Sequence, residues 1–237
     1  MNNLSLLKQL EENNTGRKYI VVKLNEKQEI SKMNLSNQNI TLSEDEKSKM
    51  VKQVSEKYSE VLDALKIDWK NDPNSKETPN RVAKALVYEL FSGRFEPKPS
   101  ITRFPNDGYT GIVFQGNIDV TSCCSHHHNP FVGKAYVAYI PKKEGKVIGL
   151  SKINRIVEWY SRRPQIQEGL TKQIADELSE LLETEGLVVL IKAKHMCCSS
   201  RGVKHDSEMI TCTPTGFFLT NKDGCKDEFF KMIDQLQ

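Results

Sequence analysis

The sequence predicts an α+β fold, with an antiparallel sheet that carries helices on one face and a helical region before it. Two observations support this class. Apolar residues recur at helical spacing from residue 43 onward, and strong strand-like runs appear in the second half of the chain. The predicted order of elements is helices, strand, strand, two helices, strand, strand, helix. We divide the chain into a tail (1–42), an N-terminal helical region (43–108) and an α+β domain (109–237).

Residues 1–42 are rich in Asn, Lys, Gln and Ser and contain few large apolar residues. Such a segment buries too little apolar surface to fold by itself, so we expect a polar, mobile tail in which residues 20–22 form at most a short strand.

The helical region has two recognisable helix starts. Ser43 and Glu46 form a capping-box pattern, and apolar residues at helical spacing follow it. Thr78 as N-cap before Pro79 begins a second helix, which we expect to end at Gly93.

The α+β domain is predicted from alternation, apolar stripes and breaking residues. Its expected elements are a strand through Ile118 and Val120, a strand at 132–140, helices at 151–160 and 165–183, strands at 187–193 and 209–219, and a helix at 227–236.

Composition excludes several classes of protein. The chain has 237 residues and a net charge of +3, which is too small to indicate nucleic-acid binding. It contains no apolar run long enough to span a membrane, and its N-terminus lacks the pattern of a signal peptide. We therefore expect a cytoplasmic protein, in which cysteines are more often metal ligands or reactive thiols than disulfides.

Two distant clusters hold most of the cysteines and histidines. They are Cys123-Cys124-Ser125-His126-His127-His128 and His195-Met196-Cys197-Cys198. Thiolate and imidazole are ligands of zinc, and three protein ligands plus a water mark a catalytic zinc site. Two such segments favour a shared metal, whereas each alone could be buried small cysteines or a solvated histidine loop.

Spacing does not choose the ligands. In an extended chain, residues two apart point the same way, so His195 and Cys197 are expected to face one pocket. Cys124 and His126 can do likewise, whereas a turn would bring His127 round instead. Surplus histidines beside a metal indicate acid–base chemistry, because imidazole titrates near neutral pH.

Two further segments suggest an anionic substrate. Gly149-Leu150-Ser151-Lys152 begins a helix, where backbone N–H groups favour anions, and Arg155 and Arg201 add charge. Glu168 can accept two N–H bonds from the edge of a base such as guanine. The plainer alternatives are a solvated basic helix face and an acidic residue that compensates the helix dipole.

Five ordered motifs over about residues 45–237 resemble GTP cyclohydrolase I. They are Thr78-Pro79-Asn80-Arg81-Val82, Cys124-Ser125-His126-His127 before Pro130-Phe131, Gly149-Leu150-Ser151-Lys152 before Arg155, Arg163-Pro164-Gln165-Ile166-Gln167-Glu168 before Leu170-Thr171, and His195-Met196-Cys197 before Arg201-Gly202. The resemblance implies a tunnelling fold, a homo-oligomer (usually a decamer) with active sites between subunits, and conversion of GTP and water to 7,8-dihydroneopterin triphosphate and formate.

The resemblance also implies roles for single residues. Cys124, His127 and Cys197 are the expected Zn²⁺ ligands. The expected proton-transfer residues are His195, the general acid, and His126, which lies near Gln167. Ser151, Lys152, Arg155 and Arg201 are expected to hold the triphosphate and ribose, and Glu168 to read the guanine edge with help from Gln167.

This sequence departs from the family pattern at four positions. Ser125 replaces the usual Glu, His128 and Asn129 replace apolar residues, and Gly169 replaces a common Arg. We expect the changes at Ser125 and at His128 with Asn129 to alter pH optimum or metal preference without changing the reaction. Two other functions stay open: another tunnelling-fold pterin or deazaguanine enzyme, and a non-catalytic, zinc-stabilised GTP-binding module.

Overall fold

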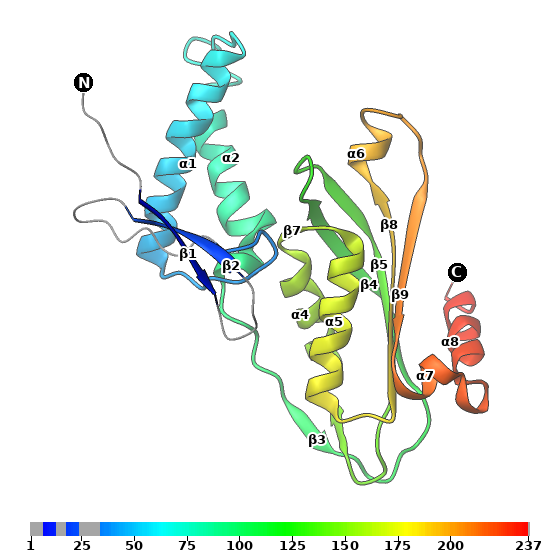
Figure 1. Cartoon of the computed structure of the whole chain (residues 1–237). Coiled ribbons are helices and arrows are strands. Elements are labelled where there is room, and N and C mark those ends of the chain that lie inside the picture. The colour runs from blue at the N-terminus through cyan, green and yellow to red at the C-terminus, as the bar shows by residue number, and fades with distance from the viewer. Residues whose placement is uncertain (1–6, 13–17, 24–33, 237) are drawn as a thin grey trace.

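The computed structural model describes residues 7–12, 18–23 and 34–236 (Figure 1). The elements are, in chain order, β1 (Leu7–Glu12), β2 (Lys18–Lys23), α1 (Glu44–Ala64), α2 (Thr78–Lys84), the π-helical segment η1 (Ala85–Leu90), α3 (Ser92–Phe95), β3 (Arg103–Pro105), β4 (Val113–Cys124), β5 (Pro130–Ile140), β6 (Lys146–Ile148), α4 (Leu150–Ser161), β7 (Pro164–Gln165), α5 (Gln167–Leu182), β8 (Gly186–His195), α6 (Met196–Ser199), β9 (Glu208–Pro214), α7 (Gly216–Thr220), the 3-10 turn η2 (Lys222–Gly224) and α8 (Cys225–Asp234).

A five-stranded sheet in the order β7-β4-β5-β8-β9 forms the centre of the molecule. The pairs β4–β5, β5–β8 and β8–β9 are antiparallel, which confirms the predicted α+β class. The two-residue β7 is the exception and pairs parallel with the end of β4. The strand pairs β1–β2 and β3–β6 form two further small sheets.

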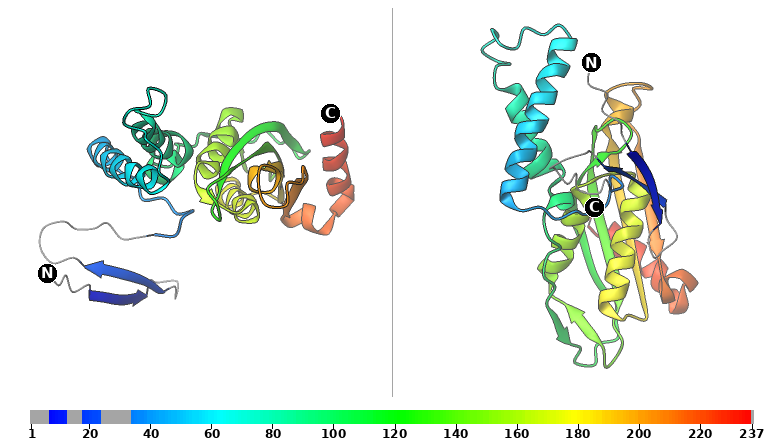
Figure 2. Two further views of the ribbon diagram at one scale, coloured as in Figure 1. Left: turned by 90° about the horizontal axis from the view of Figure 1, so that it is seen from above. Right: turned by 60° about the vertical axis from the view of Figure 1, so that its left-hand side comes forward.

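Helices cover both faces of this sheet. Residues Ala135, Val137 and Tyr139 of β5 pack with α4 and α5, whereas the alternate residues Tyr136 and Ala138 pack with α7 and α8. The prediction of helices on one face is therefore correct for α4 and α5 and wrong for the C-terminal helices. Figure 2 shows the resulting order of layers: α1 with α2, then α4 with α5, the sheet, and α8.

The helix starts were predictable, but one helix end was not. The capping box of Ser43 and Glu46 begins α1 as expected. Thr78 is the first residue of α2 rather than its N-cap, which is Glu77. Gly93 does not end a helix but lies inside α3, where an added Cβ would stand 1.9 Å from the Trp159 carbonyl oxygen. Close packing of α3 on α4 explains this glycine.

The segment 34–42 is attached to α3, which corrects the prediction of a mobile tail for these residues. Arg94 Nη1 donates to the carbonyl oxygens of Leu35, Ser36 and Gln38. Asn39 Nδ2 donates to the Glu96 carbonyl oxygen at 2.6 Å. The expected strand at 20–22 lies within β2. Residues 1–6, 13–17 and 24–33 lie outside the described residues.

The chain after β8 differs from the prediction at two places. The strand expected at 209–219 ends at Pro214, because Gly216 (φ +51°) turns the chain into α7. Met196 begins the short helix α6, which sequence periodicity could not reveal in four residues. In the described part of the chain, no helix is long and apolar enough to cross a membrane.

Candidate active site

The two cysteine–histidine clusters meet at one end of the sheet. β4 ends at Cys124 and β8 ends at His195, and both flank the start of β5. The register pairs Cys123 with Pro130 and Phe131 with His195, so β5 holds the two strand ends level. The β4–β5 connection and α6 lie at the same end of the molecule (Figure 1).

Two thiols from these separate elements are in contact. Burial, together with hydrogen bonds to the thiols of Cys124 and Cys198, raises the pKa of Cys197 to about 11. The Cys124 Sγ lies 3.7 Å from Nδ1 of His126. A cation bound beside Cys197 would act in the opposite direction, because it favours the thiolate.

The three histidines of the first cluster are exposed: His126 and His127 lie on a turn at residues 125–127, and His128 follows it. His127 Nε2 stands 2.9 Å from Arg201 Nη1, and the His128 ring meets Phe91 edge-on at 5.5 Å. Within the described residues, no three His, Cys, Asp or Glu side chains are already gathered as a metal group. The expected alignment of His195 with Cys197 is also wrong in its premise, because Cys197 lies on α6 and not on an extended strand.

His195 is fixed by two buried neighbours. Its Nε2 lies 2.8 Å from Oε1 of Gln167, and its ring stacks on Phe131 at 4.6 Å with an interplanar angle of 10°. Burial lowers the pKa of His195, and the nearby charge of Glu168 acts in the opposite direction. The histidine that forms a hydrogen bond with Gln167 is thus His195, whereas the resemblance places His126 near Gln167.

Three of the four expected anion-binding residues lie near the start of α4, whereas Arg201 lies beside His127. Gly149 is the N-cap of α4, so Ser151 and Lys152 lie in its first turn, and Arg155 follows one turn later. The other end of α4 leads into β7, which pairs with Cys124. At about 1.5 Å per residue, α4 separates Ser151 from that end by roughly 15 Å. Within one chain, Ser151 and Lys152 therefore lie apart from the two cysteine–histidine clusters.

Three residues around His195 and Gln167 carried no predicted role. Phe131 and Thr171 belong to the recognised motifs, and that membership was the available signal. Thr211, whose Oγ1 is 3.1 Å from Nε2 of Gln167, gave no signal in the sequence. Glu168 lies exposed in the first turn of α5, so its place fits both the base-reading role and simple dipole compensation.

Comparison with known proteins identifies the family. The family model for GTP cyclohydrolase I matches residues 54–234. A protein named GTP cyclohydrolase 1 from Wigglesworthia glossinidia brevipalpis is 42% identical over 76% of this chain and 83% of its own. Proteins with that name from Flavobacterium johnsoniae (46% identical, over 69% of this chain and 72% of theirs) and Haemophilus ducreyi (38%, over 87% and 94%) are also similar. The chain therefore belongs to the GTP cyclohydrolase I family.

Proposed function

We propose that this protein is a GTP cyclohydrolase I, which hydrolyses GTP to 7,8-dihydroneopterin triphosphate and formate. Family membership supports the activity. The single observation that carries it to this chain is the meeting of a thiol pair, Cys124 and Cys197, with a histidine held by Gln167 and Phe131. A purely zinc-stabilised binding module has no need of the positioned His195.

The donor set fits Zn²⁺. Two thiols from different elements already adjoin, and thiolates with an imidazole are ligands that zinc favours. We infer that Cys124, Cys197 and His127 hold the metal, and that His127 turns from Arg201 to do so. When bound, zinc supplies a Lewis acid that lowers the pKa of a coordinated water and favours attack on C8 of guanine.

The side chains around the metal supply proton transfer. His195 acts as the general acid that protonates N7 of guanine as the imidazole ring opens. Gln167 orients it, and Phe131, which is fully buried, keeps water from one face of its ring. His126, beside Cys124, is close enough to the same centre to serve the later proton transfers.

Substrate binding explains the remaining charged residues. Glu168 accepts N–H bonds from the guanine edge, and Ser151, Lys152, Arg155 and Arg201 bind the triphosphate and ribose. Since α4 holds the first three of these far from its own metal end, we infer that they serve the site of a neighbouring subunit. This places the active site between subunits of a homo-oligomer, with a decamer as the expected assembly.

Incubation with GTP tests the activity through formate release and the fluorescence of oxidised neopterin. His195→Ala should abolish turnover and retain zinc, whereas Cys124→Ser should lose zinc. Cys212→Ser is the matched control, because Cys212 is an exposed cysteine outside both clusters and should keep its metal. Zinc-loaded wild-type protein that forms no product would contradict the proposal.

The shared site is tested by complementation. His195→Ala and Lys152→Ala should each be inactive alone. Co-expressed in one cell, they should form mixed oligomers that regain part of the activity, because some interfaces then combine an intact His195 with an intact Lys152. Mixed oligomers without activity would show that both residues act within one subunit.

A further inference from the structure

We propose that Thr211 and Thr171 are positioning residues that hold the Gln167 side chain in place, and that Gln167 in turn sets the tautomer of His195. The inference rests on the proposed role of His195 as general acid. It assigns the proton that His195 gives to the substrate to Nδ1, and assigns Nε2 to a permanent hydrogen bond with Gln167.

The orientation of the Gln167 amide follows from its surroundings. Gln167 is fully buried, and its Nε2 lies 3.0 Å from the Ile191 carbonyl oxygen and 3.1 Å from that of Met209. Both carbonyl groups only accept hydrogen bonds, so the nitrogen must face them. A reversed amide would set its own oxygen against two carbonyl oxygens and leave them without donors.

The tautomer of His195 follows from that orientation. Gln167 Oε1 can only accept, so His195 Nε2, at 2.8 Å, must donate. The neutral imidazole therefore carries its hydrogen on Nε2. In the protonated ring the second hydrogen is on Nδ1, and this is the one that leaves. The Nδ1–H bond breaks as the N7–H bond forms, and the ring becomes neutral with Nε2–H still bound to Gln167.

The two threonines close a ring of hydrogen bonds with a single consistent direction. Thr171 Oγ1 donates to the backbone carbonyl oxygen of Gln167 at 2.9 Å. It must therefore accept from Thr211 Oγ1, which lies 2.5 Å away. Thr211 Oγ1 has then used its hydrogen and accepts from Gln167 Nε2 at 3.1 Å. Each hydroxyl donates once and accepts once, and such closed chains strengthen one another.

This ring ties the first turn of α5 to the edge strand β9. Thr171 is fully buried on α5, and Thr211 lies on β9 opposite Ile191 of β8. The ring thus holds the amide of Gln167 against both strands while its oxygen holds His195. Without Thr211, the amide nitrogen keeps only the two backbone acceptors, and the start of α5 is freer to move.

The test compares Thr211→Val, which removes the hydroxyl at nearly constant shape, with Thr211→Ser, which retains it. Loss of one ordinary hydrogen bond should reduce kcat by roughly three- to tenfold with little change in KM. Thr211→Ser should restore most of the rate. Thr213→Val is the matched control, because Thr213 lies on the same face of β9 two residues along.

A spectroscopic arm separates this inference from the proposed function. Solid-state ¹⁵N NMR of histidine-labelled, zinc-loaded protein reports the tautomer, and His195 is assigned among five histidines by its absence from His195→Ala. Wild type should show neutral His195 with hydrogen on Nε2, and Thr211→Val should show the same tautomer, because the two backbone acceptors still orient the amide. Hydrogen on Nδ1 in wild type, or a Thr211→Val protein with wild-type kcat, would overturn the inference.

Each failure has its own signature. If wild type turns over no GTP, the proposed function is wrong, yet the NMR measurement still decides whether Gln167 sets the tautomer of His195. If Thr211→Val does not fold, Thr171→Val tests the same ring from α5, because it removes the acceptor of the Thr211 hydroxyl.

Discussion

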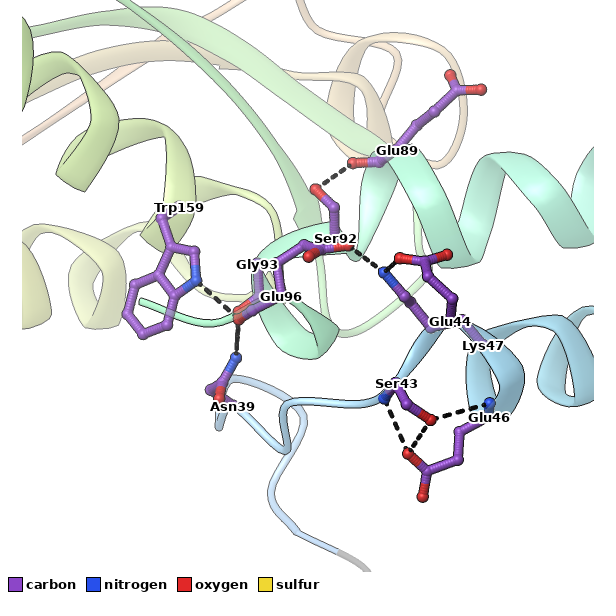
Figure 3. A network of polar contacts seen from close by, with 10 residues as sticks. All are labelled: Asn39, Ser43, Glu44, Glu46, Lys47, Glu89, Ser92, Gly93, Glu96 and Trp159. Carbon is purple, nitrogen blue, oxygen red and sulfur yellow. Dashed lines mark hydrogen bonds and ion pairs between the residues drawn. The ribbon is translucent and has the colours of Figure 1, made fainter. Parts of the chain in front are cut away.

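Glu96→Gln is expected to destabilise the protein more than Lys47→Met, although the two residues form one ion pair. Lys47 is 2% exposed, and its ammonium lies 2.5 Å from Oε1 of Glu96 and also contacts Glu44 (Figure 3). The pair joins the first turn of α1 to the end of α3. The two substitutions differ, however, in the charged group that remains without its partner.

The asymmetry comes from burial. Glu96 is 43% exposed and Glu44 is 77% exposed, so both carboxylates are hydrated once Lys47 is gone. Lys47→Met should therefore change stability by no more than about 1 kcal/mol. Glu96→Gln instead leaves the buried Lys47 ammonium with Glu44, an exposed carboxylate, as its remaining partner. We expect a cost of about 2 kcal/mol, below the roughly 3–5 kcal/mol of a fully buried pair.

The effect should also depend on pH in one direction. Hydrogen bonds from Lys47 to Glu44 and Glu96 raise the pKa of the lysine above its ordinary value of 10.5. A raised pKa contributes stability that is fully present below the unfolded value and is lost as pH rises through the folded one. The difference between wild type and Lys47→Met should thus be constant from about pH 7 to pH 9 and change only above about pH 10.5.

Thermal unfolding at one fixed protomer concentration measures these differences. For a chain of this length, about 2 kcal/mol lowers Tm by roughly 4–8 °C. Glu89→Gln, an exposed carboxylate on η1, is the control and should leave Tm unchanged. A Lys47→Met protein that loses as much Tm as Glu96→Gln would refute the reasoning, since it would mean that the lysine contributes net stability.

Three further substitutions test local parts of the fold by thermal or urea unfolding. Gly169→Ala should stabilise by roughly 0.5–1 kcal/mol, because Gly169 lies in α5 and an added Cβ meets its nearest neighbour at 3.6 Å; an unchanged or lower Tm would contradict this. Gly133→Ala should destabilise the protein by about 2 kcal/mol or more, because its Cβ would lie 2.0 Å from the Lys192 carbonyl oxygen. A wild-type Tm would show that β5 and β8 can move apart at this point without loss of stability. Ser43→Ala should cost about 1 kcal/mol through loss of the capping box with Glu46, and a neutral result would mean that packing alone holds the start of α1.

The parts of the fold predicted from sequence are those set by neighbouring residues. The capping box of α1, the apolar stripe of α5 and the alternation leading to Cys124 each depend on spacings of two to four residues. The short α6 and β7 were missed because only contacts distant in sequence define them. The second helical layer was missed too, although β5 is buried on both faces from Ala135 to Ile140, a pattern that indicates covering on both sides.

The chemistry of the site was predictable and its pairings were not. Residue types identified thiols, imidazoles and an acidic residue suited to a metal and a base. That Gln167 binds His195 depends on how α5 packs across β8, which no motif encodes. That His127 faces Arg201 depends on the turn at 125–127, where sequence reasoning had left three histidines open.

The most consequential pairing is one that a single chain does not make. α4 carries Ser151 and Lys152 in its first turn, and its last turn leads through β7 to Cys124. A straight helix of this length keeps its ends about 16 Å apart, and burial of Ile153, Ile156 and Val157 against the sheet leaves it no freedom to bend the ends together. On the proposed function, each chain therefore contributes Ser151, Lys152 and Arg155 to one site, and its metal ligands with Arg201 to another. We propose that assembly, rather than a movement within the subunit, completes the catalytic centre.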